Sequence, residues 1–309
     1  MCSRPTSLAR LTVRLAKRTS SRLRRTRPQF SLDACPAESS IDSGASATLA
    51  TAVQKRMLNP LDHPFLILAI SLPTFWLFAL TGAWLHKRAR DFGQDSHDDF
   101  QFVLGGTLTL LALIVGFTFS MAVNRYDQRK NYEEQEANAI GTEYVRADLL
   151  PSADGAKVRA LLRSYLDQRI LNYKSRDAQQ LRRSDTETAR LQIEMWAAVA
   201  IPNATHLSPV TALAVAGMND VLNSQGYTQA AWWNRIPVAA WIMMAMMSVL
   251  CNLLIGYVAY GRRRFVFFIL PVALAIAFFL IADIDSPRGG VIVVEPQNLE
   301  SVAESLHSP

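Results

Sequence analysis

Residues Phe102 to Val123 read FVLGGTLTLLALIVGFTFSMAV, without a single charged side chain. A helix needs roughly 20 apolar residues to cross the hydrocarbon core of a bilayer. Three more blocks meet this requirement: Phe65–Leu85 (FLILAISLPTFWLFALTGAWL), Ile236–Tyr260 and Phe265–Ala282. Buried helices of soluble proteins seldom stay uncharged for so long. The sequence therefore predicts four transmembrane helices and makes the lipid bilayer the first partner of the chain.

The four blocks form two pairs along the chain, separated by a long polar segment. Residues 58–123 hold the first two spans, residues 124–235 an extramembrane helical segment, and residues 236–284 the last two spans. Residues 285–309 form a C-terminal tail. This order predicts an all-α integral membrane protein in which two pairs of transmembrane helices flank a long helical segment.

The first 57 residues are a basic tail with no sustained apolar period, which is typical of disorder. They hold 11 of the 32 Lys and Arg residues and only Asp33, Glu38 and Asp42 as acids, so the net charge of +6 belongs to this stretch. We therefore predict no nucleic-acid partner. The tail also resembles an organelle transit peptide. Alternatively, translation starts at Met57 and the tail lies upstream of it.

The polar segment shows the spacing of amphipathic helices. Four helices are expected there: Tyr126–Leu150, Gly155–Tyr173, Ala178–Ala200 and Ser208–Asn223. Pro151 and Pro202 are expected to end the first and third, and Gly226 to follow the fourth. The first carries apolar residues three and four apart, namely Ala137, Ile140, Tyr144 and Ala147. After the last span, residues 289–294 (GGVIVV) are a candidate short strand.

No pattern of an enzyme is visible, so the chain is predicted to be a non-enzyme without cofactor or metal. The histidines are scattered without ligand spacing: His63, His86, His97, His206 and His307. The acidic run Glu133-Glu134-x-Glu136 is typical of a solvated or salt-bridged helix face.

The second span carries the most specific pattern. Its uncharged helix continues directly into Asn124–Asp127, which indicates a single rod that crosses the membrane and extends beyond it. Thr109, Leu113 and Phe117 are four residues apart and therefore share one face of this helix. From the residues alone, packing on neighbouring helices is the favoured interpretation of that face.

A family resemblance adds a second interpretation. Gly116-Phe117, followed after seven residues by Arg125-Tyr126, resembles the second span of bestrophins. The chain is most similar to the bacterial bestrophin-like domain family of unknown function, over roughly Met57 to Leu299. The stretches GFTFSMAVNRYDQR, EANAIGTEYVRADLLP, AAWWNRIP and IADIDSPRGG carry this resemblance.

Bestrophins are pentameric anion channels whose second helix lines the pore and forms an apolar neck. By position, the resemblance implies neck residues at Leu113 and Phe117, with Thr109 one turn above. Two departures put the pore in question: Thr109 stands where an apolar residue is expected, and Tyr126-Asp127 stands where bestrophins tend to have two aromatics.

A motif after the last span, Asp283, Asp285, Pro287 and Arg288, is similar to the Asp-Pro-Phe-Gly segment of bestrophins. The two carboxylates have two interpretations. They accept hydrogen bonds from Arg288 or Arg125, or they bind a cation together with backbone carbonyls. The sequence favours the structural role, because it lacks a dense acidic cluster.

Two functions follow as hypotheses. The first is an oligomeric anion channel, a homo-pentamer if bestrophin-like, in a bacterial inner membrane. The second is a non-conducting membrane sensor or scaffold whose helical segment binds a partner. Orientation stays open: Lys87, Arg88, Arg90 and Arg262–Arg264 place the short loops in the cytoplasm by the positive-inside rule, whereas the basic tail and the bestrophin resemblance favour the reverse.

Overall fold

A computed structural model describes residues 62–88, 94–205, 208–259 and 266–307. The helices are α3 (Pro64–Arg88), α4 (Gln94–Arg146), the 3-10 turn η3 (Ala147–Leu149), α5 (Ser152–Lys174), α6 (Ala178–Thr205), α7 (Thr211–Trp233), α8 (Val238–Val258), α9 (Val266–Asp285) and α10 (Gln297–His307). The predictions for the basic tail and for the loops at 89–93 and 260–265 lie outside the described residues.

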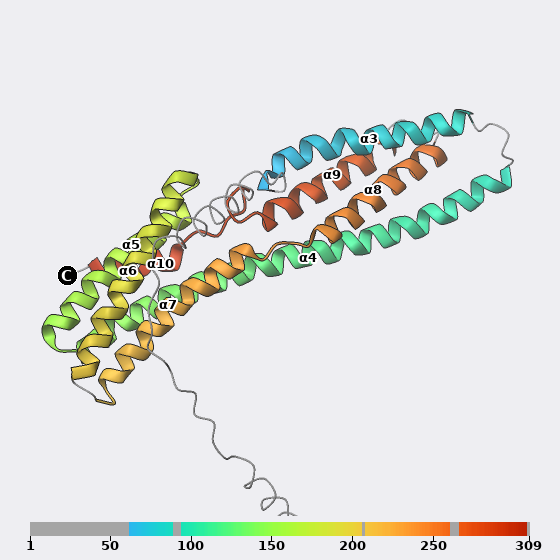
Figure 1. The fold of residues 1–309 in the computed structure, drawn as a ribbon. Helices are drawn as coiled ribbons and strands as arrows, with labels where there is room; N and C mark the ends of the chain where they lie inside the picture. The colour runs from blue at the N-terminus through green and yellow to red at the C-terminus, as the bar shows by residue number, and fades with distance from the viewer. Residues whose placement is uncertain (1–61, 89–93, 206–207, 260–265, 308–309) are drawn as a thin grey trace, which may run out of the picture. The chain divides into compact units, whose positions relative to one another are not determined.

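The four predicted spans are confirmed as helices long and apolar enough to cross a membrane. They are α3, the first half of α4, α8 and α9. In space the neighbours along the chain are not the main packing partners. α3 packs chiefly on α8 and α9, and α4 contacts both of these helices in addition to α7; α8 and α9 lie between α3 and α4 in Figure 1.

Glycines allow α3 and α8 to approach closely. A Cβ at Gly82 would collide with the backbone of Leu253, and a Cβ at Gly256 would collide with the backbone of Ala79. Small residues at a membrane helix crossing allow van der Waals contact between backbones, which replaces the hydrophobic driving force that lipid does not supply. The Phe75 ring adds an edge contact with Phe278 of α9, at 5.2 Å between centroids.

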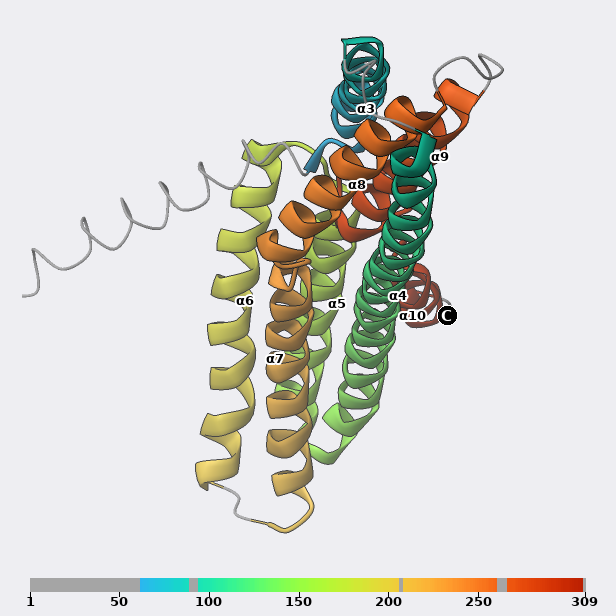
Figure 2. The ribbon, with the colours of Figure 1, turned by 90° about the vertical axis from the view of Figure 1, so that its right-hand side faces the viewer.

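A second core forms outside the spans. The second half of α4 packs on α7, α5 packs on α6, and α6 packs on α7, as Figure 2 shows. α10 lies against α4 and α5. The fully buried residues of this second core include Tyr165, Leu166, Met195 and Met218. The predicted helical segment is therefore a packed bundle to which α4 contributes its polar half.

Three local predictions were wrong. α6 continues past Pro202 to Thr205, and α7 runs through Gly226 to Trp233. One proline or glycine weakens a helix by a few kcal/mol at most, and tertiary packing overrides that preference. Residues 289–294 form no strand: 289–292 are bends and 293–294 are irregular, because the amides of Val291 and Ile292 bond to the side chain of Asp283 instead of a neighbouring strand.

Candidate functional site

The candidate site lies along α4, which is one unbroken helix of 53 residues. At 1.5 Å per residue it is about 80 Å long, well over twice the roughly 30 Å thickness of a hydrocarbon core. The predicted rod is present, so side chains inside and outside the membrane keep a fixed helical register.

One face of the span half of α4 is packed against the other spans. Its buried residues are Leu111, Ile114, Thr118 and Ala122. The hydroxyl of Thr118 donates to the carbonyl of Ile114 at 2.8 Å, so this buried polar group is satisfied within its own helix. In the membrane half, α4 therefore packs on the other spans through this face alone.

The opposite face holds the three predicted neck residues, and all three are exposed in the single chain. Leu113 is 53% exposed and Phe117 is 63% exposed. The Thr109 hydroxyl donates to the carbonyl of Gly105 at 2.9 Å, which turns its polar atom back to the helix and leaves its methyl group outward. No other group lies within 4 Å of where a Cβ on Gly116 would stand.

The same face continues beyond the membrane. We define the open stripe as the exposed residues that follow each other at three or four positions on this face: Thr109, Leu113, Phe117, Ser120, Asn124, Asp127, Asn131, Gln135 and Asn138. Its membrane half is apolar, and its outer half is polar with Asp127 as the one charged member. Sequence reasoning found Asp127 but not the Ser, Asn and Gln residues.

Arg125 and Tyr126, the rest of the predicted post-span motif, lie off the stripe. Tyr126 packs on the core of the spans. Arg125 is half-buried, and its buried Nε and Nη1 atoms have no hydrogen-bond partner. One turn on, Arg129 is fully buried and donates to the carbonyl of Ile284 at 2.8 Å. Burial lowers the pKa of Arg129 to about 10.

The two aspartates in the last turn of α9 are buried, and both accept hydrogen bonds from other parts of the chain. The Asp283 carboxylate accepts the backbone amides of Val291 and Ile292 at 2.7 and 2.8 Å. Asp285 accepts Nε of Arg235 at 3.0 Å and the amide of Ile236 at 3.1 Å. The bonds come from neither Arg125 nor Arg288, the two donors that the sequence suggested. Among the described residues no group of three metal-ligating side chains occurs.

Arg288 points to the extramembrane bundle instead. Its guanidinium lies 3.9 Å from the ring centroid of Trp232, and its Nη2 donates to the carbonyl and side-chain oxygens of Asn172 at 3.1 and 2.8 Å. Its neighbour Pro287 and Arg288 itself line a cavity beside the end of α5. The four residues of the motif therefore anchor the segment after α9 to two different parts of the chain.

The acidic run on α4 is mostly buried, which sequence reasoning missed. Glu133 accepts the amides of Asn298 and Leu299 at 3.0 and 2.9 Å, and so caps the start of α10. Glu136 is paired with Arg169, and both are buried. Of the two predicted alternatives, a solvated face was wrong for both residues, whereas a salt-bridged face is confirmed for Glu136. Glu133 lies four positions before Ala137 and Glu136 four positions before Ile140, so the helical period could have found them.

The family described as "Bestrophin-like domain" matches residues 73–299. A crystal structure of a bacterial bestrophin homologue from Klebsiella pneumoniae is 16% identical and covers 78% of this chain and 96% of its own, with a TM-score of 0.56. A point variant of it reaches 0.57 at 16% identity, covering 77% of this chain and 95% of that chain. No curated protein matches the sequence significantly.

Proposed function

Because this chain belongs to the bestrophin-like domain family, we propose that it is an oligomeric membrane channel for small anions. In this proposal α4 lines the pore, and Leu113 and Phe117 form an apolar neck. Copies of the chain surround one axis, five copies if the assembly follows bestrophins, in a bacterial inner membrane.

The open stripe is the observation that carries this proposal. α4 satisfies its packing with the opposite face, so the stripe is free to face a common axis. Lipid alone would favour large apolar residues, as on α3, where Phe65, Ile70 and Leu77 are exposed. The stripe instead becomes polar after Phe117 and stays almost uncharged, which suits a water-filled passage.

The two halves of the stripe would do different work on an ion. A ring of leucine and phenylalanine side chains offers no hydrogen bonds, so water leaves it easily and conduction stops when the ring is narrow. The Ser, Asn and Gln side chains beyond it can donate to an anion or accept from water. The pore would therefore be gated at Phe117, and the ion would be hydrated beyond it.

The test is a current measurement on purified chain in planar bilayers, after its oligomeric mass has been verified. The wild type is expected to conduct chloride, with a reversal potential that follows the chloride gradient. Phe117→Ala should raise the open probability several-fold, because smaller side chains leave a wider opening that water does not leave. Phe119→Ala is the matched control, because Phe119 lies on the same helix but outside the stripe.

Equal gating in Phe117→Ala and Phe119→Ala would remove the neck. The absence of current in a verified oligomer would remove the channel and favour the scaffold. One observation supports that alternative: Ile193 and Trp196 on α6 are 73% and 42% exposed, an apolar pair that a partner protein could cover.

A further inference from the structure

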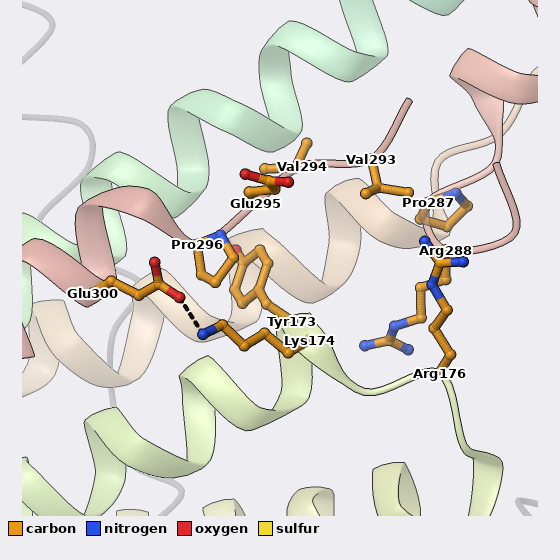
Figure 3. Close-up of a pocket in the computed structure, with 10 residues that line it drawn as sticks. All are labelled: Tyr173, Lys174, Arg176, Pro287, Arg288, Val293, Val294, Glu295, Pro296 and Glu300. Atoms are coloured by element: carbon orange, nitrogen blue, oxygen red, sulfur yellow. Dashed lines mark ion pairs between the residues drawn. The ribbon is translucent and has the colours of Figure 1, made fainter. Parts of the chain in front are cut away.

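A cavity of about 390 Å³ lies between the end of α5 and the segment that joins α9 to α10. Figure 3 shows its residues. Two parts of it differ in chemistry: Arg176, Arg288 and the Lys174–Glu300 ion pair are charged, whereas Val293, Val294 and Pro296 are apolar. Pockets of a few hundred Å³ with an apolar wall and a few polar groups are typical of small-molecule sites.

We propose that this cavity binds a small molecule that carries a phosphate or similar oxyanion, with Arg176 and Arg288 holding the anion. The apolar body of the ligand would lie on Val293, Val294 and Pro296. This site is separate from the open stripe of α4, and the proposal does not depend on conduction.

The fold leaves one donor of Arg288 unsatisfied. Its Nη2 is occupied by Asn172, but its Nε is buried without a hydrogen-bond partner. Burial lowers the pKa of Arg288 to about 10, which shows that the fold holds this cation at a cost in solvation. An oxyanion would offset that cost, because guanidinium binds phosphate and carboxylate through paired, charge-assisted hydrogen bonds.

The charges around the cavity favour an anion over a cation. Lys174 and Glu300 neutralise one another through their ion pair. Arg176 and Arg288 remain, against the exposed carboxylate of Glu295. In Figure 3 the two arginines lie at one end of the cavity and the ion pair lies at the other, so the positive charge is concentrated at one end.

A ligand there would connect two parts of the fold. Tyr173 and Arg176 belong to the end of α5 and the following turn, whereas Arg288 and Pro296 belong to the segment between α9 and α10. That segment begins where the last span ends. Occupancy would therefore stabilise the contact between the last span and the extramembrane bundle.

The test uses the full chain in phosphatidylcholine nanodiscs, titrated with phenyl phosphate by isothermal calorimetry. We expect a Kd below about 1 mM. Arg176→Gln and Arg288→Lys should each weaken binding by at least about tenfold, the usual loss for a charged hydrogen bond. Lys157→Gln removes an exposed charge from the first turns of the same helix α5 and should leave the Kd unchanged.

Two arms of the experiment identify the source of the phosphate. Inorganic phosphate should bind more weakly than phenyl phosphate, because it lacks the apolar body. If nanodiscs with phosphatidylglycerol weaken phenyl phosphate binding in the wild type, the ligand in the cell is a lipid headgroup. If the affinity is equal in both discs, the ligand is a soluble molecule.

Two outcomes would overturn the proposal. One is that the wild type in phosphatidylcholine nanodiscs, where no phosphatidylglycerol competes, binds neither phenyl phosphate nor inorganic phosphate. The other is equal binding by Arg176→Gln and Lys157→Gln. Arg288 is largely buried and its variant could misfold, but Arg176 is exposed, so its variant keeps the test decisive.

Discussion

The two halves of α4 solve the same packing problem with opposite chemistry. Within the membrane its packed face is apolar, with Leu111, Ile114 and Ala122 buried against the other spans. Beyond the membrane the packed face buries charge, at Arg129 and Glu136 among others. Lipid offers no hydrogen bonds to a buried charge, whereas the extramembrane bundle supplies partners such as Arg169 for Glu136. The first half is therefore held by shape and the second half by specific pairs.

The largest expected effect is in the charged half. Glu136 accepts from Arg169, at 3.3 Å from Nη2, and from the hydroxyl of Thr228 at 3.1 Å. Glu136→Ala leaves a buried guanidinium without its counter-charge, which typically costs about 3–5 kcal/mol of stability. We expect a large drop in the apparent Tm in detergent. Glu187→Ala is the control, because Glu187 pairs with Arg190 only at the surface, where water screens the ion pair and its loss should change the Tm little.

The next effect tests the half that is held by shape. Gly256→Ala places a Cβ against the backbone of Ala79, and backbone cannot move aside as a flexible side chain can. Overpacking of this kind costs about 1–3 kcal/mol. Gly116→Ala is the matched variant, because its Cβ would stand in open space within the single chain. Equal loss of thermal stability in both variants would contradict the packing described for α3 and α8.

The smallest effect concerns Glu143, the one acid of α4 between residues 100 and 146 that is buried without a hydrogen-bond partner. Glu143 lies beside Gly217, with Arg146 and Asp220 as its charged neighbours. Burial raises its pKa from 4.5 to about 8. Between these values the folded chain keeps the proton that the unfolded chain has lost, so stability falls as the pH rises from 4.5 to 8 and then levels off.

Glu143→Gln should flatten that pH dependence. The variant should therefore match the wild type near pH 5 and exceed its apparent Tm by a few degrees near pH 8, since each pKa unit corresponds to about 1.4 kcal/mol. Melting curves from pH 5 to 9 measure this. A wild-type profile that rises with pH while the variant stays flat would contradict the raised pKa.

The sequence predicted the apolar half of α4 better than the charged half. Phe102–Val123 needs no partner information, because length and the lack of charge decide that it spans a membrane. The roles of Glu133 and Glu136 depend on α10 and Arg169, which are far away along the chain. A carboxylate on a helix reads as solvated until its partner is known. The same distance hid Arg235 and Ile236, the donors to Asp285.

The sequence also predicted only part of the face that holds Thr109, Leu113 and Phe117. Helical spacing placed the three residues together. It did not say which face of α4 the other spans would cover, because both faces of the span are apolar. The exposed outer half of the stripe was missed, since Asn124 and Asn131 carry no motif of their own.

The capping of α10 by Glu133 has a consequence for biosynthesis. The carboxylate is made with α4, but the amides of Asn298 and Leu299 that satisfy it leave the ribosome after every other described helix. Until then the extramembrane bundle contains an acid without its donors and a vacancy where Leu299 will be buried. The packing of the bundle therefore depends on residues that are made last, and a chain truncated before Asn298 would lack both the donors to Glu133 and the buried side chain of Leu299.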